Sequence, residues 1–196
     1  MRLTITILIA AVLTNCKVDK KELSTVGDTD TTTIYSIATQ DIQTNEIPKK
    51  VFEMGSLRKL TIIGMDCDYI QVDEKGNDIT KCWAIREIPK EIKKLKKLET
   101  LELRVNSIQT LPKEIRELKN LKTLDLTDNP GLSNIDNVIE LENLEELVLF
   151  GCYLTKLPAD IGQLKKLRYL GLTGNNIELT EQGRIKKVLP TCDIKF

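Results

Sequence analysis

The stretch LPKEIRELKNLKTLDLTDN, residues 111–129, combines two periodicities and decides the fold. Its first part places Leu111, Ile115 and Leu118 at spacings of four and three residues, which is the period of an amphipathic helix. Its second part places Leu124 and Leu126 two residues apart between polar residues, which is the period of a strand. Two periods in so short a segment indicate the junction between two structural units.

The same pattern returns every 23 residues, in segments that start at 98, 121, 144 and 167. The shared frame is LxxLxLxxNxLxxLPxxIxxLxx, and in the first segment it is filled by Leu98, Leu101, Leu103, Asn106, Ile108, Leu111, Pro112, Ile115 and Leu118. One unit cannot enclose a core, so we expect neighbouring units to stack, bury their leucines and pair their strands in a parallel sheet. The inward-turning positions are expected to satisfy backbone groups with their side chains: Asn106, Asn129, Cys152 and Asn175.

This frame resembles the leucine-rich repeat, specifically the 23-residue LPxEIxxLxxL subclass that is frequent in bacterial surface and secreted proteins. The resemblance covers residues 34–196 and implies an α/β solenoid, a leucine-rich repeat horseshoe of about six units with a parallel concave sheet. Repeat starts fall near 57, 98, 121, 144 and 167. Tyr35, Ile37 and Ile42 are expected to form a degenerate first strand, and residues 180–196 a C-terminal cap with a helix and a short strand.

The N-terminus predicts export. An arginine precedes an apolar run over residues 3–14, which is too short to span a bilayer but suits a secretory signal over residues 1–15. The run ends at Cys16 and resembles the lipobox of bacterial lipoproteins, although Asn15 stands where a small residue is usual. We therefore expect Cys16 to be acylated and to anchor the chain in a membrane, with an ordinary signal peptide or a buried strand as the alternatives. Residues 16–33, rich in Lys, Asp and Thr, are expected to be a flexible tether.

An insert at about residues 66–83 interrupts the second unit and is expected to form a β-hairpin. Cys67 and Cys82 bracket it, and in an oxidising compartment they are expected to form a disulfide, with free thiols as the alternative. Cys152 and Cys192 are expected to be separate buried thiols. The acidic residues of the insert do not fit a calcium-binding EF-hand loop, so a solvated hairpin is favoured over an irregular calcium site.

Composition excludes several classes of function. Lys plus Arg and Asp plus Glu both total 29, so the chain has no basic excess for nucleic acid. No histidine is present, which excludes Ser–His–Asp and Cys–His catalysis and histidine-ligated zinc within this chain. We predict that the protein is not an enzyme, needs no cofactor or metal, and is a monomer. The lysines at 90, 93, 94, 96 and 97 suggest anion binding, but the glutamate among them and the overall neutrality of the chain favour a solvated face.

The candidate site lies on the concave face, at the strand positions between the leucines. Val148, Phe150 and Tyr169 are expected to point outward, with Tyr153 nearby. Such an aromatic cluster on a polar face is typical of a protein-binding hot spot, although good strand formers in surface packing would give the same pattern. Glu102, Arg104 and Asp125, with Asp128, are expected to form a polar rim or to pair with one another.

The sequence therefore predicts an exported, lipid-anchored module that binds a partner protein through its concave face. The expected location is the bacterial outer membrane or cell surface, or the medium if the chain is secreted. A structural envelope protein that binds cell wall or glycan is the alternative.

Overall fold

The computed structural model describes residues 33–65, 74–75 and 82–196. The predicted signal peptide, Cys16, the tether up to residue 32, Cys67 and most of the predicted hairpin lie outside the described residues, so those expectations remain predictions. The irregular calcium site, which was the alternative to a solvated hairpin, lies on this same insert and is likewise untested.

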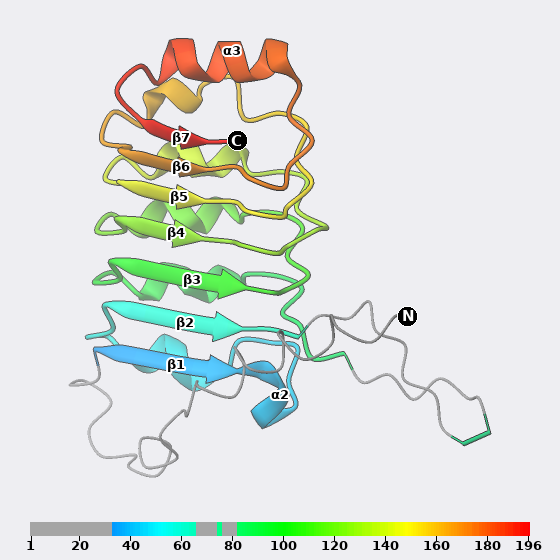
Figure 1. The fold of residues 1–196 in the computed structure, drawn as a ribbon. Helices are drawn as coiled ribbons and strands as arrows, with labels where there is room; N and C mark the ends of the chain where they lie inside the picture. The colour runs from blue at the N-terminus through cyan, green and yellow to red at the C-terminus, as the bar shows by residue number, and fades with distance from the viewer. Residues whose placement is uncertain (1–32, 66–73, 76–81) are drawn as a thin grey trace.

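Seven parallel strands form one open sheet in the order of the chain, which confirms the predicted leucine-rich repeat solenoid (Figure 1). The strands are β1 (Ile34–Ala38), β2 (Lys59–Ile63), β3 (Thr100–Arg104), β4 (Thr123–Asp125), β5 (Glu146–Val148), β6 (Tyr169–Gly171) and β7 (Asp193–Lys195). Tyr35 and Ile37 lie in the N-terminal edge strand as predicted. Ile42 does not, because the chain turns after Ala38 into the short helix α2 (Thr39–Ile42).

The convex arms are 3₁₀-helices and not the α-helices that the amphipathic spacing suggested. They are η1 (Lys49–Glu53), η2 (Lys90–Lys94), η3 (Lys113–Glu117), η4 (Asp136–Glu140) and η5 (Ile161–Gln163). A proline precedes η1, η2 and η3, and each 3₁₀-helix ends at a residue that turns the chain back toward the sheet, such as Leu118 after η3. A 23-residue repeat leaves room for little more than one turn, and the i, i+3 contacts of a 3₁₀-helix keep the same leucines and isoleucines inward.

Three asparagines cross-link successive repeats inside the stack, as predicted. Asn129 accepts a hydrogen bond from the Ile108 N–H at 3.0 Å and donates to the Leu103 carbonyl at 2.8 Å. Asn106 and Asn175 bond to the preceding repeat in the same way. Cys152, at the equivalent position, makes only the donated hydrogen bond of this pair: its Sγ lies 3.1 Å from the Leu126 carbonyl.

The residue before each inward position has a left-handed backbone. Val105, Asp128, Gly151 and Gly174 lie 23 residues apart and have φ between 55° and 78°. This conformation favours glycine, so the two glycines suit the turn and Val105, which is β-branched, is held there at a cost. A sharp turn at a fixed place in every repeat follows from these angles.

The C-terminal cap replaces a missing repeat. In the array the Leu111 N–H donates to the Asn134 carbonyl of the next repeat. At the equivalent place the Leu157 N–H donates to the Glu181 carboxylate, and Arg184 donates to the Leu157 and Ala159 carbonyls. Both side chains belong to α3 (Leu179–Val188), which covers the end of the core. The predicted cap helix and the strand after it, β7, are confirmed.

Candidate binding face on the concave sheet

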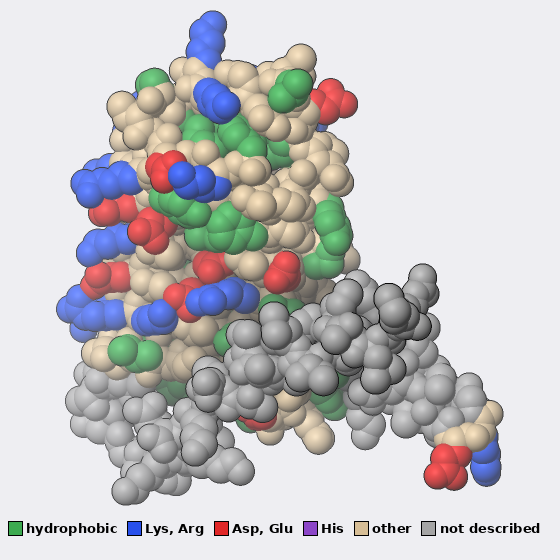
Figure 2. All heavy atoms as spheres, in the orientation of Figure 1, with side chains coloured by type: hydrophobic (Ala, Val, Ile, Leu, Met, Phe, Trp, Pro, Cys, Tyr) green, Lys and Arg blue, Asp and Glu red, His purple; other side chains and the backbone are tan. Residues whose placement is uncertain are grey.

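The register of the sheet aligns the outward-facing strand residues of successive repeats in columns. One column runs through Lys59, Thr100, Thr123, Glu146 and Tyr169. The next runs through Thr61, Glu102, Asp125, Val148 and Gly171. Lys59, Glu102 and Asp125 place charges on β2–β4. Val148 and Tyr169 place apolar and aromatic groups on β5 and β6, where Glu146 is the charged residue of the two columns. Figure 2 shows the difference, with charged groups across the lower sheet face and an apolar area above them.

The lower half carries a closed charged cluster, made of Lys59, Thr61, Glu102, Arg104, Asp125 and Thr127. Glu102 accepts hydrogen bonds from Lys59 Nζ at 2.7 Å and from Arg104 Nη2 at 2.8 Å, as well as from the Thr61 hydroxyl at 3.0 Å. Arg104 Nε lies 3.0 Å from Asp125 Oδ2 as an ion pair without hydrogen-bond geometry. Asp125 also accepts from Thr127 N–H and Oγ1 at 2.9 and 2.6 Å.

Glu102 is therefore not the exposed strand residue that its position in the frame suggested. Only 8% of it is exposed, because the long side chains of Lys59 and Arg104 lie over it. Burial acts to raise the pKa of Glu102, but the hydrogen bonds from Lys59, Arg104 and Thr61 outweigh burial and hold the pKa below its ordinary value. Of the two arrangements expected for these charges, the structure has them paired with one another.

The upper half carries the aromatic patch, defined as Val148, Phe150 and Tyr169 around Gly171. Val148 lies opposite Gly171 in the sheet, and all three side chains are partly exposed. The Phe150 ring lies over Gly171, because a Cβ added to Gly171 would meet Phe150 Cε1 at 2.6 Å. Phe150 can lie flat on the neighbouring strand only because residue 171 lacks a side chain. The role of Gly171 is not apparent from the repeat frame.

Tyr153 lies beyond the end of β5, after the turn at Cys152, and is 61% exposed. It has a left-handed backbone with φ 56°, which no counterpart in the other described repeats shares. An aromatic residue in this conformation is uncommon and is often held in place at a functional site. The structure therefore places Tyr153 on a strained loop beside the strand face, whereas Val148, Phe150 and Tyr169 belong to the sheet.

A second charged feature follows one edge of the concave sheet. Its charges alternate strictly from repeat to repeat: Arg58, Glu99, Lys122, Glu145 and Arg168. Glu99 pairs with Arg58 on one side and with Lys122 at 2.8 Å on the other. Figure 2 shows this edge as alternating blue and red groups. Each exposed ion pair of this kind contributes little to the free energy of unfolding, and pairing leaves these charges less available to a partner.

Both thiols in the repeat region are free, as predicted. Burial raises the pKa of Cys152 to about 11, so its thiol stays protonated and donates to the Leu126 carbonyl. Burial likewise raises the pKa of Cys192 to about 11, although Cys192 is only partly buried. Cys82 is not among the free thiols, and its predicted pairing with Cys67 stays a prediction because Cys67 lies outside the described residues.

The other surfaces of the described residues are weaker candidates for a binding site. A cavity of about 460 Å³ lies beside η1 and η2, lined by Phe52, several glutamates, Lys49 and Lys94, and so has no single charge to select a ligand. Within the described ranges no group of three acidic or cysteine side chains is placed to hold a metal. None of the helices in that part of the chain has the length and apolarity needed to cross a bilayer.

Comparison with known proteins agrees with this architecture. Residues 78–189 match the family described as leucine-rich repeat region. The chain belongs to the leucine-rich repeat family. A leucine-rich repeat protein of Leptospira interrogans is 36% identical over 77% of this chain, with a TM-score of 0.63. Such repeats generally serve as protein-binding surfaces and not as catalysts.

Two more distant structures share the fold alone. An internalin of Listeria monocytogenes is 19% identical over 82% of the chain, with a TM-score of 0.57. The leucine-rich repeat domain of the type III effector XopL is 22% identical over 83% of the chain, with a TM-score of 0.56. The chain spans 34% of the Leptospira structure and 40% of the internalin structure. No curated protein sequence matches it.

Proposed function

We propose that this protein is an exported, lipid-anchored interaction module that binds a partner protein through its concave face. The aromatic patch carries the proposal. Partly exposed Val148, Phe150 and Tyr169 lie together on a face whose charges on β2–β4 are already paired. Aromatic side chains that desolvate on contact supply much of the energy of protein interfaces, while paired charges around them favour specificity.

Replacing both Phe150 and Tyr169 by alanine tests the patch. A partner retained by the immobilised wild-type protein should bind the double variant at least about 30-fold more weakly, as expected for the loss of a hot spot. Circular dichroism and urea unfolding would show whether the variant still folds. If it unfolds, single variants at the same positions that keep the fold decide whether binding depends on the patch.

A matched control is Leu179→Ala. Leu179 is 83% exposed on the cap helix α3, away from the concave face. The substitution removes exposed apolar area without touching the patch, so partner binding should not change. Equal loss in the control and the double variant would contradict a specific site. Retention of isolated cell wall instead of host extracellular protein, in the same assay, would favour the envelope role.

Lipid anchoring at Cys16 and location at the outer membrane or cell surface form the second part of the proposal. They are supported by the apolar run and the cysteine at its end. Intact-mass measurement of the protein from native membranes should show cleavage before Cys16 and the mass of added acyl chains. A Cys16→Ser variant should leave the membrane fraction, and unchanged partitioning of that variant would overturn the anchor.

A further inference from the structure

We infer that the partner presents a lysine or arginine side chain next to an apolar side chain, and that Glu146 binds this cation beside the aromatic patch. The inference rests on the proposed function of the concave face and names the chemistry of its partner.

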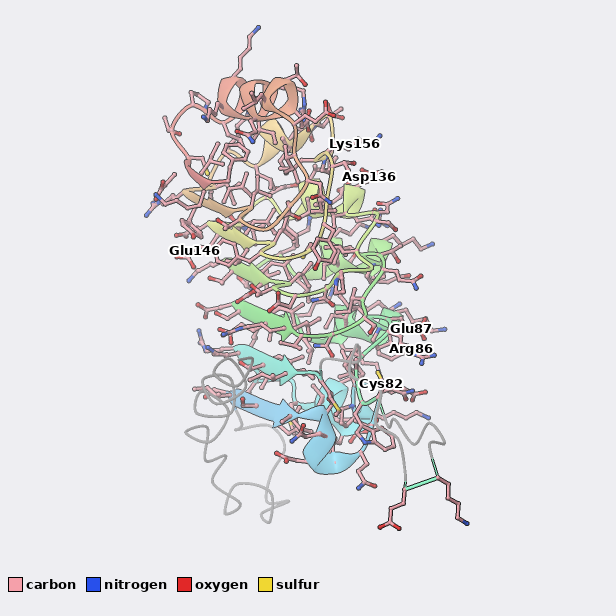
Figure 3. All side chains as sticks on the ribbon, turned by 45° about the vertical axis from the view of Figure 1, so that its right-hand side comes forward. Cys82, Arg86, Glu87, Asp136, Glu146 and Lys156 are labelled. Atoms are coloured by element: carbon pink, nitrogen blue, oxygen red, sulfur yellow. The ribbon has the colours of Figure 1, made fainter. Side chains whose placement is uncertain are left out.

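Glu146 carries the unpaired side-chain charge of β5 and β6. It is exposed on β5, and among the described residues its carboxylate forms no hydrogen bond or ion pair, whereas its backbone N–H is bonded to the Lys122 carbonyl. Figure 3 shows it projecting from the sheet on the side away from Asp136 and Lys156. A carboxylate held on a strand with nothing bound to it is ready to accept charge-assisted hydrogen bonds from a cation.

The aromatic patch adjoins this carboxylate. Glu146 and Tyr169 are partners across β5 and β6, so their Cα atoms are about 5 Å apart. Val148 follows two residues along the same face, and the Phe150 ring lies over Gly171. A guanidinium or ammonium group at Glu146 therefore comes within reach of the Tyr169 ring, where a cation–π contact adds to the ion pair. An apolar neighbour of that cation then meets Val148 and Phe150.

The charges around the patch exclude the other partner chemistries. Lys59 and Arg104 are bonded to Glu102 and Asp125, and Lys195 lies 2.8 Å from Asp193. These positive groups are therefore not free to bind an acidic partner, which Glu146 would also repel. An uncharged apolar partner would cover Glu146 without satisfying it, which costs free energy. A cation beside an apolar group satisfies both parts of the surface.

A library of short random peptides displayed on phage tests this chemistry. Peptides are selected on the immobilised protein, and those that also bind the Phe150→Ala variant are removed. The remaining peptides should be enriched in lysine or arginine beside a large apolar residue. Synthetic copies should bind a Glu146→Lys variant at least about 10-fold more weakly, because an attraction becomes a repulsion.

Glu142→Lys is the matched control. It makes the same change of charge at a carboxylate that is 77% exposed on the turn before β5. Peptide affinity should change less than about 2-fold in this variant, since exposed charges that do not touch the ligand are screened by salt. Phe150-dependent peptides that are acidic or uncharged, or that bind Glu146→Lys normally, would overturn the inference and leave the proposed function standing. Absence of any Phe150-dependent peptide would overturn both.

Discussion

The two halves of the concave face are built on one backbone frame and have opposite character. On β2–β4, Lys59, Arg104, Glu102 and Asp125 satisfy one another. On β5 and β6, at the same frame positions, apolar groups are partly exposed, and the Glu146 carboxylate has no hydrogen-bond or ion-pair partner among the described residues.

We therefore expect stability and recognition to be divided between the halves. The leucines and asparagines inside the stack are equivalent in both halves. The backbone frame is therefore not the cause of the difference between their surface residues. A charged cluster that is closed on itself stabilises the sheet but offers a partner few free groups. An apolar patch that stays open contributes less to folding and more to binding. Substitutions in the two halves should separate these roles.

The largest effect is expected from Arg104→Ala. Removing the guanidinium leaves Glu102 and Asp125, which are opposite each other in adjacent strands, without the cation between them. Loss of the charge-assisted contacts and repulsion between the carboxylates should lower the free energy of unfolding by about 2–3 kcal/mol. Urea unfolding measures this change.

Arg116→Ala is the control. Arg116 is 55% exposed, and the carboxylate oxygen of its ion-pair partner Glu117 is 3.8 Å away. Loss of the Arg116 side chain should therefore cost less than about 0.5 kcal/mol of the free energy of unfolding. Equal effects of the two variants would show that the cluster does not stabilise the sheet.

A smaller loss is expected from Gly171→Ala in the other half. The added methyl group occupies the space of the Phe150 ring, which must leave the strand surface. Overpacking of this kind should cost about 1–2 kcal/mol and should disappear when Phe150 is also replaced by alanine. Gly183→Ala is the control, since apart from the adjoining residues and the backbone of its own helix no atom lies within 4 Å of the added Cβ, and the helix should gain about 0.5–1 kcal/mol. If the losses of stability in the two single variants simply add in the double variant, the position of the Phe150 ring does not depend on Gly171.

Acidification should weaken the charged half through Glu102. Its pKa is lower in the folded protein than its ordinary value of 4.5, so the ionised form stabilises the fold above that pH. This stability is lost as the pH falls below 4.5 and through the pKa of the folded protein. The stability difference between wild type and Glu102→Gln, measured by urea unfolding, should therefore shrink toward acidic pH. A difference that is constant with pH would contradict the role of the ionised carboxylate.

The smallest effect is expected from Tyr153→Gly. Glycine relieves the left-handed strain at φ 56° but loses more backbone entropy on folding, so a net gain of about 0.5 kcal/mol is expected. The melting temperature should rise by about 1–2 °C, while binding of a partner that touches Tyr153 should weaken. A fall in melting temperature would indicate that the tyrosine side chain packs on the fold and is not held there for binding.

The sequence predicted the repeat, the inward asparagines, the cap helix and the strand positions that face outward on the concave sheet. It gave the wrong helix type for the convex arms because i, i+3 spacing fits a 3₁₀-helix as well as an α-helix. It also predicted an exposed Glu102. Frame positions show which way a residue points but not how far neighbouring lysine and arginine side chains reach over it.

The period of 23 residues by itself determined the solenoid, since leucines at that spacing can be buried only when units stack and pair their strands. Only the tertiary structure decided which surface groups are satisfied. Lys59 bonds to Glu102 across 43 residues, and Phe150 rests on Gly171 of the next repeat. Such contacts depend on side-chain conformations where two repeats meet, and these are set by packing and not by the period.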